Sequence, residues 1–357
     1  MITALGLMSG TSLDGVDAAI IKTNGENIGE FGPFLTLEYP AEFKLSVKEL
    51  MAGQGNALAV EKELTLWHAQ AVKEIIGNNE PPEIIGFHGQ TIWHKPEQGQ
   101  TWQIGDGSFL ANLTQISGVN DFRSHDVKNG GQGAPLVPVF HQALARNLPK
   151  PLIFLNLGGV GNITYIGPNQ ELIAFDTGPG NALLDDWVLK HTGKSCDYNG
   201  FLSQNGQIDT LVIERFNDLA YFRLLPPKSL DRNQFHSFAL DALAGLNPTD
   251  GAATLAALTV QSVVLALPHL PKKPELCLVC GGGRHNPVIM DSLRQALKIP
   301  VQPVEKMGFN GDAIEAQAFA FLAVRSLKKL PLSFPSTTGV KTPLSGGKLH
   351  FGVTMQK

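Results

Sequence analysis

The N-terminal segment Ile2-Thr-Ala-Leu-Gly-Leu-Met-Ser-Gly-Thr-Ser-Leu-Asp-Gly-Val-Asp-Ala-Ala-Ile-Ile21 decides the fold. An apolar run enters a polar turn and a second apolar run leaves it, which predicts a strand, a glycine turn and another strand. Glycine permits close backbone approach, so successive N–H groups of the turn can point into one concavity, with the hydroxyls of Thr11 and Ser12 as further donors. Such a turn suits a polyphosphate. An ordinary hairpin turn rich in Ser, Gly and Asp explains the pattern equally well.

Two carboxylates, Asp14 and Asp17, belong to the same segment and could hold a hydrated metal ion. The segment is not a Walker loop, because it lacks a Gly-Lys-Ser/Thr ending and no helix is expected directly after it. The missing helix also excludes a dinucleotide-binding fingerprint.

The composition is that of an ordinary soluble globular protein. With 357 residues, 43% of them hydrophobic and 17% charged, two lobes with a cleft between them are expected. A net charge of −4 gives no support for nucleic acid or an anionic membrane as a partner. The N-terminus lacks the basic region of a secretory signal, and the longest apolar segment, residues 255–270, is too short to span a bilayer. Three cysteines argue against a disulfide framework; Cys277 and Cys280 are expected in a buried strand, and we predict a reducing cytoplasm.

Strand and helix patterns alternate along the chain, which predicts an α/β protein. Strands are expected near residues 2–8, 16–23, 83–87, 152–157, 162–166, 172–175 and 276–280. Helices are expected near residues 57–77, 134–147, 181–192, 252–267, 286–297 and 312–328. The tail from Pro331 is rich in Pro, Ser, Thr and Gly, which favours surface coil.

The segment Ile153-Phe-Leu-Asn-Leu-Gly-Gly-Val-Gly-Asn-Ile-Thr-Tyr-Ile166 repeats the order strand, glycine turn, strand. Two such halves suggest a duplicated lobe with phosphate held between the copies, although a tight hairpin alone is the alternative. The expected organisation is an N-terminal lobe over residues 1–133, onto which the C-terminal tail can pack back, and a C-terminal lobe over residues 134–357.

A third glycine cluster, Val279-Cys-Gly-Gly-Gly-Arg-His-Asn-Pro287, joins a predicted strand to a predicted helix. Asn286 suits the N-cap of that helix and Pro287 its first position. Bare backbone at Gly281, Gly282 and Gly283 would let a flat ring or a ribose lie close, which suits an adenosine. A strand-to-helix turn that needs positive φ is the equally good alternative.

Asp176 lies in Ala174-Phe-Asp-Thr-Gly-Pro-Gly-Asn-Ala182, at the end of an apolar strand and before a rigid turn. A carboxylate placed there in a cleft is a candidate general base, because burial and rigid neighbours set its basicity and its direction. An Asx turn, in which the carboxylate bonds its own loop, is the weaker alternative.

Other polar residues are candidates for binding hydroxyls or anions. Arg123 could clamp a carboxylate or sugar oxygens in a bidentate manner, or form an exposed ion pair with Asp121 or Asp126. Gln90, Thr91 and Asp106 could bind hydroxyls, whereas His88 and His94 lack a third ligand at metal spacing and favour structural or hydrogen-bonding roles. Asp312 and Glu315 have the spacing of a capping box, which by itself explains Glu315 structurally.

Taken together, these motifs resemble the anhydro-N-acetylmuramic acid kinase family. The matching blocks follow the family order over nearly the whole chain: Met8-Ser-Gly-Thr-Ser-Leu-Asp-Gly-Val-Asp17, Gly86-Phe-His-Gly-Gln-Thr91, Gln103-Ile-Gly-Asp106, Asp121-Phe-Arg123, Gly130-Gly-Gln-Gly-Ala-Pro-Leu-Val-Pro138, Phe175-Asp-Thr-Gly-Pro-Gly-Asn181 and Cys280-Gly-Gly-Gly283. The resemblance implies the two-lobed, actin-like, duplicated ribonuclease H-like ATPase fold, α/β with mixed sheets and a central cleft. It also implies a kinase of peptidoglycan recycling that opens the 1,6-anhydro ring of anhydro-N-acetylmuramic acid with water and phosphorylates O6 from ATP.

The resemblance also implies the role of each candidate residue. Asp176 would deprotonate the attacking water, while Thr91, Arg123 and Glu315 would contact the sugar. Asp14 or Asp17 would lie near Mg²⁺ through water. ATP and its phosphates would be bound by Gly10, Thr11, Ser12, Leu13, Asp14, Gly15, Val16, Asp17, Gly158, Gly159, Asn162, Gly281, Gly282 and Gly283.

Two departures from the family pattern, Ser124-His125 and Gly107-Ser108, lie beside the expected sugar contacts and bear on the fine geometry of binding. Two other functions stay open: a kinase that phosphorylates a free hydroxyl of another amino sugar, and a non-catalytic nucleotide or sugar sensor. The expected partners are a small sugar and ATP, with no nucleic acid and no membrane, and the oligomeric state is open, a homodimer included.

Overall fold

The computed structural model describes residues 1–10 and 12–352 and divides into two compact units. Unit 1 comprises Met1–Arg146 and Asp312–Lys357, and unit 2 comprises Asn147–Gly311. The expected boundary between residues 133 and 134 therefore falls too early. The predicted boundary also placed the last long helix in the C-terminal lobe. That helix, α11 (Ile314–Leu327), instead packs on strands of unit 1.

Unit 1 is built on a mixed sheet with the strand order β12-β6-β4-β1-β2-β3, and β5 pairs with β4 at one side. β1 and β2 form the predicted hairpin, β3 extends it antiparallel, and β4 and β6 continue the sheet in parallel. The strands are β1 (Ile2–Ser9), β2 (Gly15–Thr23), β3 (Ile28–Glu38), β4 (Ile84–Lys95), β5 (Gln100–Ile104), β6 (Gly118–Asn120) and β12 (Lys348–His350).

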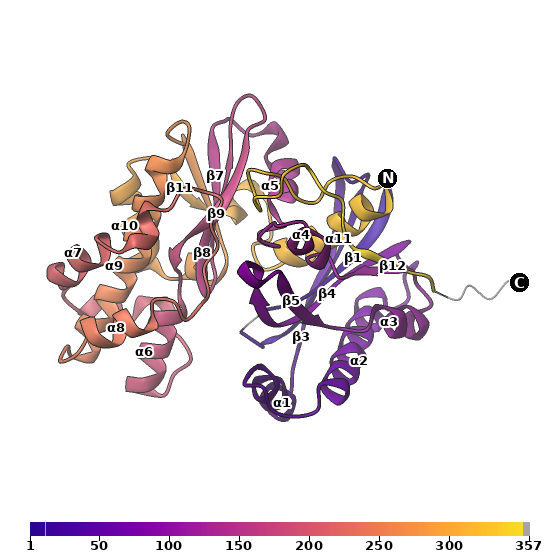
Figure 1. Cartoon of the computed structure of the whole chain (residues 1–357), viewed down its shortest axis with the longest axis horizontal. Helices are drawn as coiled ribbons and strands as arrows, with labels where there is room; N and C mark the ends of the chain where they lie inside the picture. The colour runs from indigo at the N-terminus through magenta and orange to yellow at the C-terminus, as the bar shows by residue number, and fades with distance from the viewer. Residues whose placement is uncertain (11, 353–357) are drawn as a thin grey trace, which may run out of the picture. The chain divides into compact units, whose positions relative to one another are not determined.

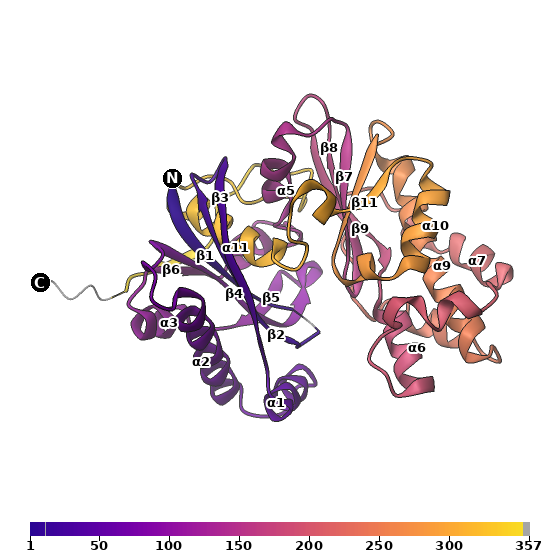
Figure 2. The same ribbon diagram turned by 180° about the vertical axis from the view of Figure 1, so that it is seen from behind.

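The helices of unit 1 cover this sheet. α11 contacts β1, β2 and β4, and α2 contacts β2 and β3, so the apolar sheet residues are buried by helices far apart in sequence. Figures 1 and 2 show α11, coloured near the C-terminal end of the scale, beside the N-terminal strands. The helices are α1 (Ala41–Met51), α2 (Ala57–Ile76), α3 (Gly107–Thr114), α4 (Ser124–Lys128), α5 (Pro138–Leu144) and α11.

Unit 2 repeats the strand plan of unit 1. Its sheet has the order β11-β10-β7-β8-β9, in which β7, β8 and β9 form an antiparallel meander, β10 pairs parallel with β7, and β11 pairs parallel with β10. The predicted duplication of a glycine hairpin within an α/β fold with mixed sheets is therefore confirmed. The strands are β7 (Leu152–Leu157), β8 (Val160–Ile166), β9 (Leu172–Pro179), β10 (Leu276–Cys280) and β11 (Val301–Pro303).

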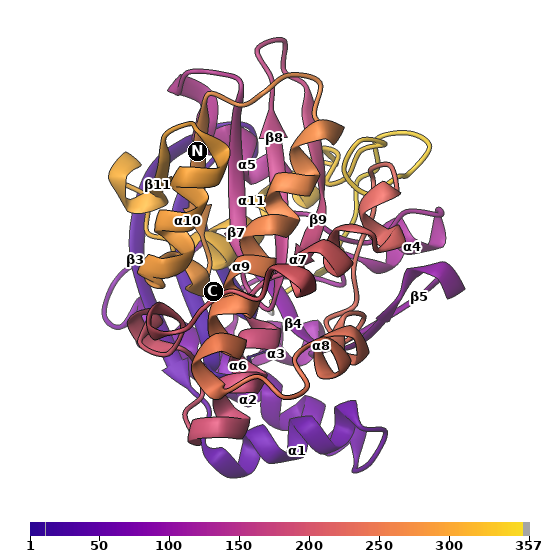
Figure 3. The same cartoon turned by 90° about the vertical axis from the view of Figure 1, so that its left-hand side faces the viewer.

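Helix α9 (Pro248–Ala266) is the central helix of unit 2 and lies against β8 and β9 (Figure 3). In the described part of the chain, the stretch Pro248–His269 is long and apolar enough to cross a membrane, so the expectation that no apolar segment reaches that length was wrong. Most of this stretch is buried inside unit 2, as in the core helix of a globular protein. The other helices are α6 (Ala182–Thr192), α7 (Thr210–Asn217), α8 (His236–Ala242) and α10 (Pro287–Leu297).

Several elements differ from the sequence-based expectation. The helix expected over residues 134–147 is shorter, because Pro138 occupies its first turn and α5 begins there. The tail from Pro331 contains β12, which pairs with β6, rather than coil alone. Cys277 and Cys280 lie buried in β10, as predicted.

Candidate active site

The first glycine turn joins β1 to β2, with Met8 opposite Asp17 in the hairpin. The N–H of Leu13 donates to the carbonyl of Gly10 at 3.1 Å and closes the turn. Leu13 has a φ of 60° and is buried, an uncommon conformation for a bulky side chain. Backbone strain of this kind gathers at ligand-binding turns. Thr11, the remaining predicted phosphate contact of the turn, lies outside the described residues.

The residues of this turn divide into two groups. Gly10 has room beside it, since a Cβ there would find Ser12 Oγ as its nearest neighbour at 3.6 Å, and Ser12 and Asp14 are exposed. A Cβ at Gly15 would instead overlap the carbonyl oxygen of Leu37 in β3, and Val16 lies in the core. Gly10, Ser12 and Asp14 are therefore accessible to a ligand, whereas Leu13, Gly15 and Val16 shape the hairpin by packing.

A buried hydrogen-bond chain supports the end of β1. Ser9 Oγ donates to Gln90 Oε1 at 2.6 Å, and the hydroxyl of Tyr39 donates to Ser9 Oγ at 3.0 Å. Gln90 is fully buried. The expectation that Gln90 binds a ligand hydroxyl is thus replaced by a structural role, and Asp106 likewise serves as the N-cap of α3.

Asp17 lies in a negatively charged environment. Burial, followed by the carboxylates of Glu315, Asp312 and Asp14, raises the pKa of Asp17 to about 6, against a lowering hydrogen bond from the Thr36 hydroxyl. Repulsion of this kind would be relieved by a hydrated cation. Within residues 1–10 and 12–352, no group of three or more His, Cys, Asp or Glu side chains has the arrangement of a direct metal site. The environment therefore fits a metal ion held through water.

Glu315 lies in the first turn of α11, and two glycines explain its position. A Cβ at Gly6 of β1 would overlap the carbonyl oxygen of Ala316, and a Cβ at Gly86 of β4 would overlap that of Phe319. The absence of these side chains lets α11 lie directly on the sheet and brings Glu315 near Asp17. Ala313, not Asp312, occupies the N-cap, so the capping-box interpretation of Glu315 was wrong.

Thr91 and Arg123 also belong to unit 1. Thr91 lies in β4 opposite Gln103 of β5, whose side-chain amide donates to Thr91 Oγ1 at 3.3 Å. Arg123 precedes α4 and donates from Nη1 to the carbonyl of Gly133 at 2.7 Å, while His88 accepts from its other nitrogens. The hydrogen-bonding role expected for His88 is therefore confirmed.

In unit 2, a row of polar residues crosses the meander. Asn156 of β7 pairs with Asn162 of β8, and Asn162 pairs with Asp176 of β9. Directly opposed residues share one face of a sheet. All three are half-buried in strands whose other residues are mostly buried. Asn156 was not among the site residues predicted from the sequence, although it stands in the same hairpin and pairs with Asn162, which was predicted to bind phosphate.

Residues 228–230, which follow the short helix Ala220–Arg223, hold Asp176 in place. Asp176 donates its N–H to the carbonyl of Lys228 at 3.0 Å, and its Oδ2 accepts from the N–H of Leu230 at 2.7 Å. The hydroxyl of Tyr221 donates to the carbonyl of Asp176 at 2.6 Å. The Asx-turn alternative is not needed, since the Oδ2 partner is distant in sequence.

Lys228 fixes residues 228–230 to Tyr221. Its Nζ donates to the carbonyl of Tyr221 at 3.1 Å and lies 4.5 Å from the centroid of the Tyr221 ring. Only 8% of Lys228 is exposed, and burial lowers its pKa to about 8. The arrangement fixes the segment by contacts that leave no mark in a sequence pattern.

The second glycine turn connects β7 and β8 and is held by the residues after β9. Asn181 donates its N–H to the carbonyl of Gly158 at 2.8 Å, and Gly180 donates to the carbonyl of Gly159 at 3.0 Å. Neither Gly158 nor Gly159 has an atom within 3.5 Å of an added Cβ, so the turn is open beside them. This turn is the structural counterpart of the one that begins at Gly10.

The three glycines after β10 have different surroundings. Gly281 has a φ of 75°, and a Cβ there would overlap Asn156 Oδ1; a Cβ at Gly283 would lie 2.6 Å from Leu157 Cβ. Gly282 is open, with its nearest neighbour at 3.8 Å. Packing against β7 thus explains Gly281 and Gly283, and Gly282 is the position that a ligand can approach.

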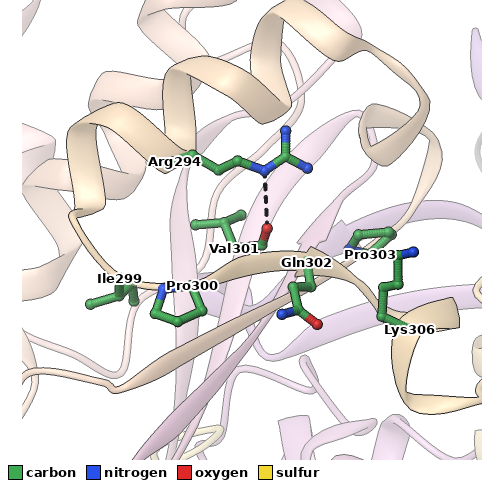
Figure 4. A pocket seen from close by; sticks show the side chains of 7 residues that line it. All are labelled: Arg294, Ile299, Pro300, Val301, Gln302, Pro303 and Lys306. Carbon is green, nitrogen blue, oxygen red and sulfur yellow. Dashed lines mark hydrogen bonds between the residues drawn. The ribbon is translucent and has the colours of Figure 1, made fainter.

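The hollows of unit 2 lie elsewhere. One of about 450 Å³ lies between α10 and β11, where Arg294 Nε donates to the carbonyl of Val301 (Figure 4). Another of about 260 Å³ is lined by residues of α6, α8 and α9, Trp187 among them. None of the predicted site residues that the structure describes lines either hollow.

The family model for anhydro-N-acetylmuramic acid kinase matches residues 2–352. A protein of that name from Paramagnetospirillum magneticum is 51% identical over 351 residues, covering 97% of this chain and 99% of the relative. One from Gluconobacter oxydans is 50% identical over 363 residues, covering 98% and 99%. Among solved structures, a ROK family glucokinase from Streptomyces griseus in complex with glucose and AMPPNP is 13% identical, with a TM-score of 0.43 over 90% of this chain and 99% of that one.

Proposed function

The chain belongs to the anhydro-N-acetylmuramic acid kinase family, and on that premise we propose how its residues carry the reaction. The protein is an ATP-dependent phosphotransferase of peptidoglycan recycling. It opens the 1,6-anhydro ring of anhydro-N-acetylmuramic acid with water and phosphorylates O6. The products are N-acetylmuramic acid 6-phosphate and ADP.

Asp176 is proposed as the general base. Its carboxylate takes a proton from the water that attacks the anomeric carbon C1, the C1–O6 bond breaks, and O6 takes the γ-phosphoryl group as ADP leaves. The proton on Asp176 then passes to solvent. The observation that carries this assignment is a half-buried carboxylate fixed by the N–H of Leu230 at 2.7 Å and by the strand hydrogen bonds around it. A general base must lie within hydrogen-bond reach of the proton that it takes, so its position is the first requirement and its pKa the second.

ATP is proposed to bind through the open positions of the glycine turns. The backbone near Gly10, Gly158 and Gly159 would face the phosphates, and Gly282 would lie against the adenosine, since each has room beside its Cα. Ser12 is exposed and would add a hydroxyl donor. Phosphoryl transfer depends mainly on positioning and charge stabilisation, which such fixed backbone donors provide.

A magnesium ion is proposed near Asp14 and Asp17, held through water. The raised pKa of Asp17 supports this, because burial is its largest cause and the carboxylates of Glu315, Asp312 and Asp14 raise it further. The ion would supply positive charge to the β- and γ-phosphates. The carboxylates of the chain would position its water ligands, and the positive charge of the ion would favour their ionised form.

The sugar is proposed to be bound by Thr91, Arg123 and Glu315. Arg123 carries a guanidinium that donates to His88 and to the carbonyl of Gly133, and such a cation suits an acidic sugar. Thr91 is fixed by Gln103 and presents a hydroxyl. A cytoplasmic location is proposed on the ground that the reaction consumes ATP.

The decisive assay uses the purified chain with ATP and 1,6-anhydro-N-acetylmuramic acid, followed by mass spectrometry of the sugar. A 6-phosphorylated product with an open ring is expected. N-acetylglucosamine, with a free 6-hydroxyl, serves as the comparison substrate. Turnover of that sugar with none of the anhydro sugar would favour a conventional amino-sugar kinase instead.

A further inference from the structure

The two ring nitrogens of His88 have different partners. Nδ1 lies 2.8 Å from the carbonyl oxygen of Gly89. A carbonyl only accepts, so Nδ1 carries the hydrogen and Nε2 is the acceptor. Nε and Nη2 of Arg123 point at this Nε2 from 3.1 Å and 3.0 Å. The contact is therefore a guanidinium donating to a neutral imidazole.

The surroundings keep His88 in this neutral form. Only 5% of the residue is exposed, and its ring centroid lies 4.5 Å from that of Phe319 in α11. Burial and then the nearby charge of Arg123 hold the pKa of His88 well below its usual value. A protonated ring would lose its acceptor and repel Arg123.

The guanidinium is held from a second side by the loop at Gly133. Arg123 Nη1 donates to the carbonyl of Gly133, and the N–H of Gly133 donates to Asp126 Oδ1 at 2.6 Å. The hydroxyl of Thr338 donates to the other oxygen of this buried carboxylate. Two fixed acceptors thus define the plane of the guanidinium.

We propose that His88 is a positioning residue for the sugar: as a neutral acceptor it aims the guanidinium of Arg123 without cancelling its charge. A carboxylate at the same place would also orient Arg123, but it would neutralise the cation that an acidic sugar needs. A neutral imidazole orients Arg123 and leaves its positive charge in place. The inference rests on the proposed role of Arg123 and adds to it the reason for a buried histidine at this place.

The test measures binding of 1,6-anhydro-N-acetylmuramic acid by calorimetry without ATP, together with KM for each substrate. His88→Phe keeps a ring against Phe319 but removes the acceptor, and it should weaken sugar binding roughly ten- to a hundredfold, with KM for ATP unchanged. His88→Gln, whose oxygen reaches about as far as Nε2, should recover most of the affinity. His68→Phe is the matched control and should leave sugar affinity unchanged, because His68 is a second buried histidine of unit 1, contacts Phe87, and has the carbonyl of Leu64 rather than Arg123 as its partner.

A double-mutant cycle separates positioning from a general structural role. In the Arg123→Ala background, His88→Phe should change sugar affinity less than about twofold. An equal loss in both backgrounds, or no loss in the wild-type background, would overturn the inference. Should His88→Phe not fold, His88→Gln is compared with His88→Asn, whose oxygen reaches only as far as Nδ1; equal sugar affinities would then contradict the inference. Failure of the wild-type chain to phosphorylate the sugar would instead count against the proposed function.

Discussion

The N–H of Leu230 donates to Oδ2 of Asp176 at 2.7 Å, across 54 residues of sequence. The same segment returns a carbonyl, that of Lys228, to the N–H of Asp176. Backbone groups therefore orient the candidate base on both its main chain and its side chain. This arrangement explains how the half-buried carboxylate of Asp176 is held in one direction.

Tyr221→Phe tests the support of this arrangement. The change removes the hydroxyl that donates to the Asp176 carbonyl at 2.6 Å, and it should lower the free energy of unfolding by about 0.5–1.5 kcal/mol. We expect kcat to fall severalfold with KM for ATP unchanged, because Asp176 is less well aimed. Chemical denaturation and steady-state kinetics give both values. Tyr198→Phe is the control, since Tyr198 is 74% exposed, and equal effects of the two changes would refute the role of Tyr221.

The glycines after β10 should separate binding from folding. Gly282→Ala places a methyl group in open space, so it should raise KM for ATP about tenfold or more with little change in stability. Gly281→Ala forces an L residue into positive φ against Asn156, and should destabilise unit 2 by several kcal/mol, roughly 3 or more. Thermal unfolding and ATP kinetics of both variants decide the point. A destabilised Gly282→Ala variant with normal KM for ATP would show that this glycine is structural.

The glycine hairpins could be predicted from sequence because strand periodicity and turn residues are local signals. The sheet on which α11 packs could not be predicted from the sequence. The helix Ile314–Leu327 is buried on nearly every side, so it has no single apolar face that would indicate one unit. Its docking depends on missing side chains at Gly6 and Gly86, far away in the chain.

In the candidate site, too, some residues could be predicted from the sequence and others could not. Asp176 and Arg123 stand out by residue type, whereas their supports are backbone groups of Leu230 and Gly133, which any residue supplies. Strand β3 was missed because it contains Gly and Pro and is mostly exposed, so it lacks the apolar alternation of a buried strand.

The pH dependence of stability should reveal the acidic environment of Asp17. Its pKa is about 6 in the folded state, against an ordinary value of 3.8, so the folded chain binds more protons between these values and stability falls as pH rises through them. Asp17→Asn removes this loss, and should stabilise unit 1 by roughly 1–3 kcal/mol at pH 8 but have little effect near pH 4. Denaturant midpoints at the two pH values measure this, with the exposed Asp218→Asn as control. A gain that is equal at both pH values would argue against ionisation as the cause.

The most direct test of the central claim is turnover in ¹⁸O-water by the wild-type chain and by Asp176→Asn, with ATP binding measured separately. The wild-type product should carry ¹⁸O at C1 and phosphate at O6. The variant keeps an oxygen that can accept from Leu230, so it should bind ATP normally while kcat falls by about 10²–10⁴-fold. Unlabelled C1 in the wild-type product, or normal turnover by Asp176→Asn, would contradict the assignment of Asp176 as the base that activates water.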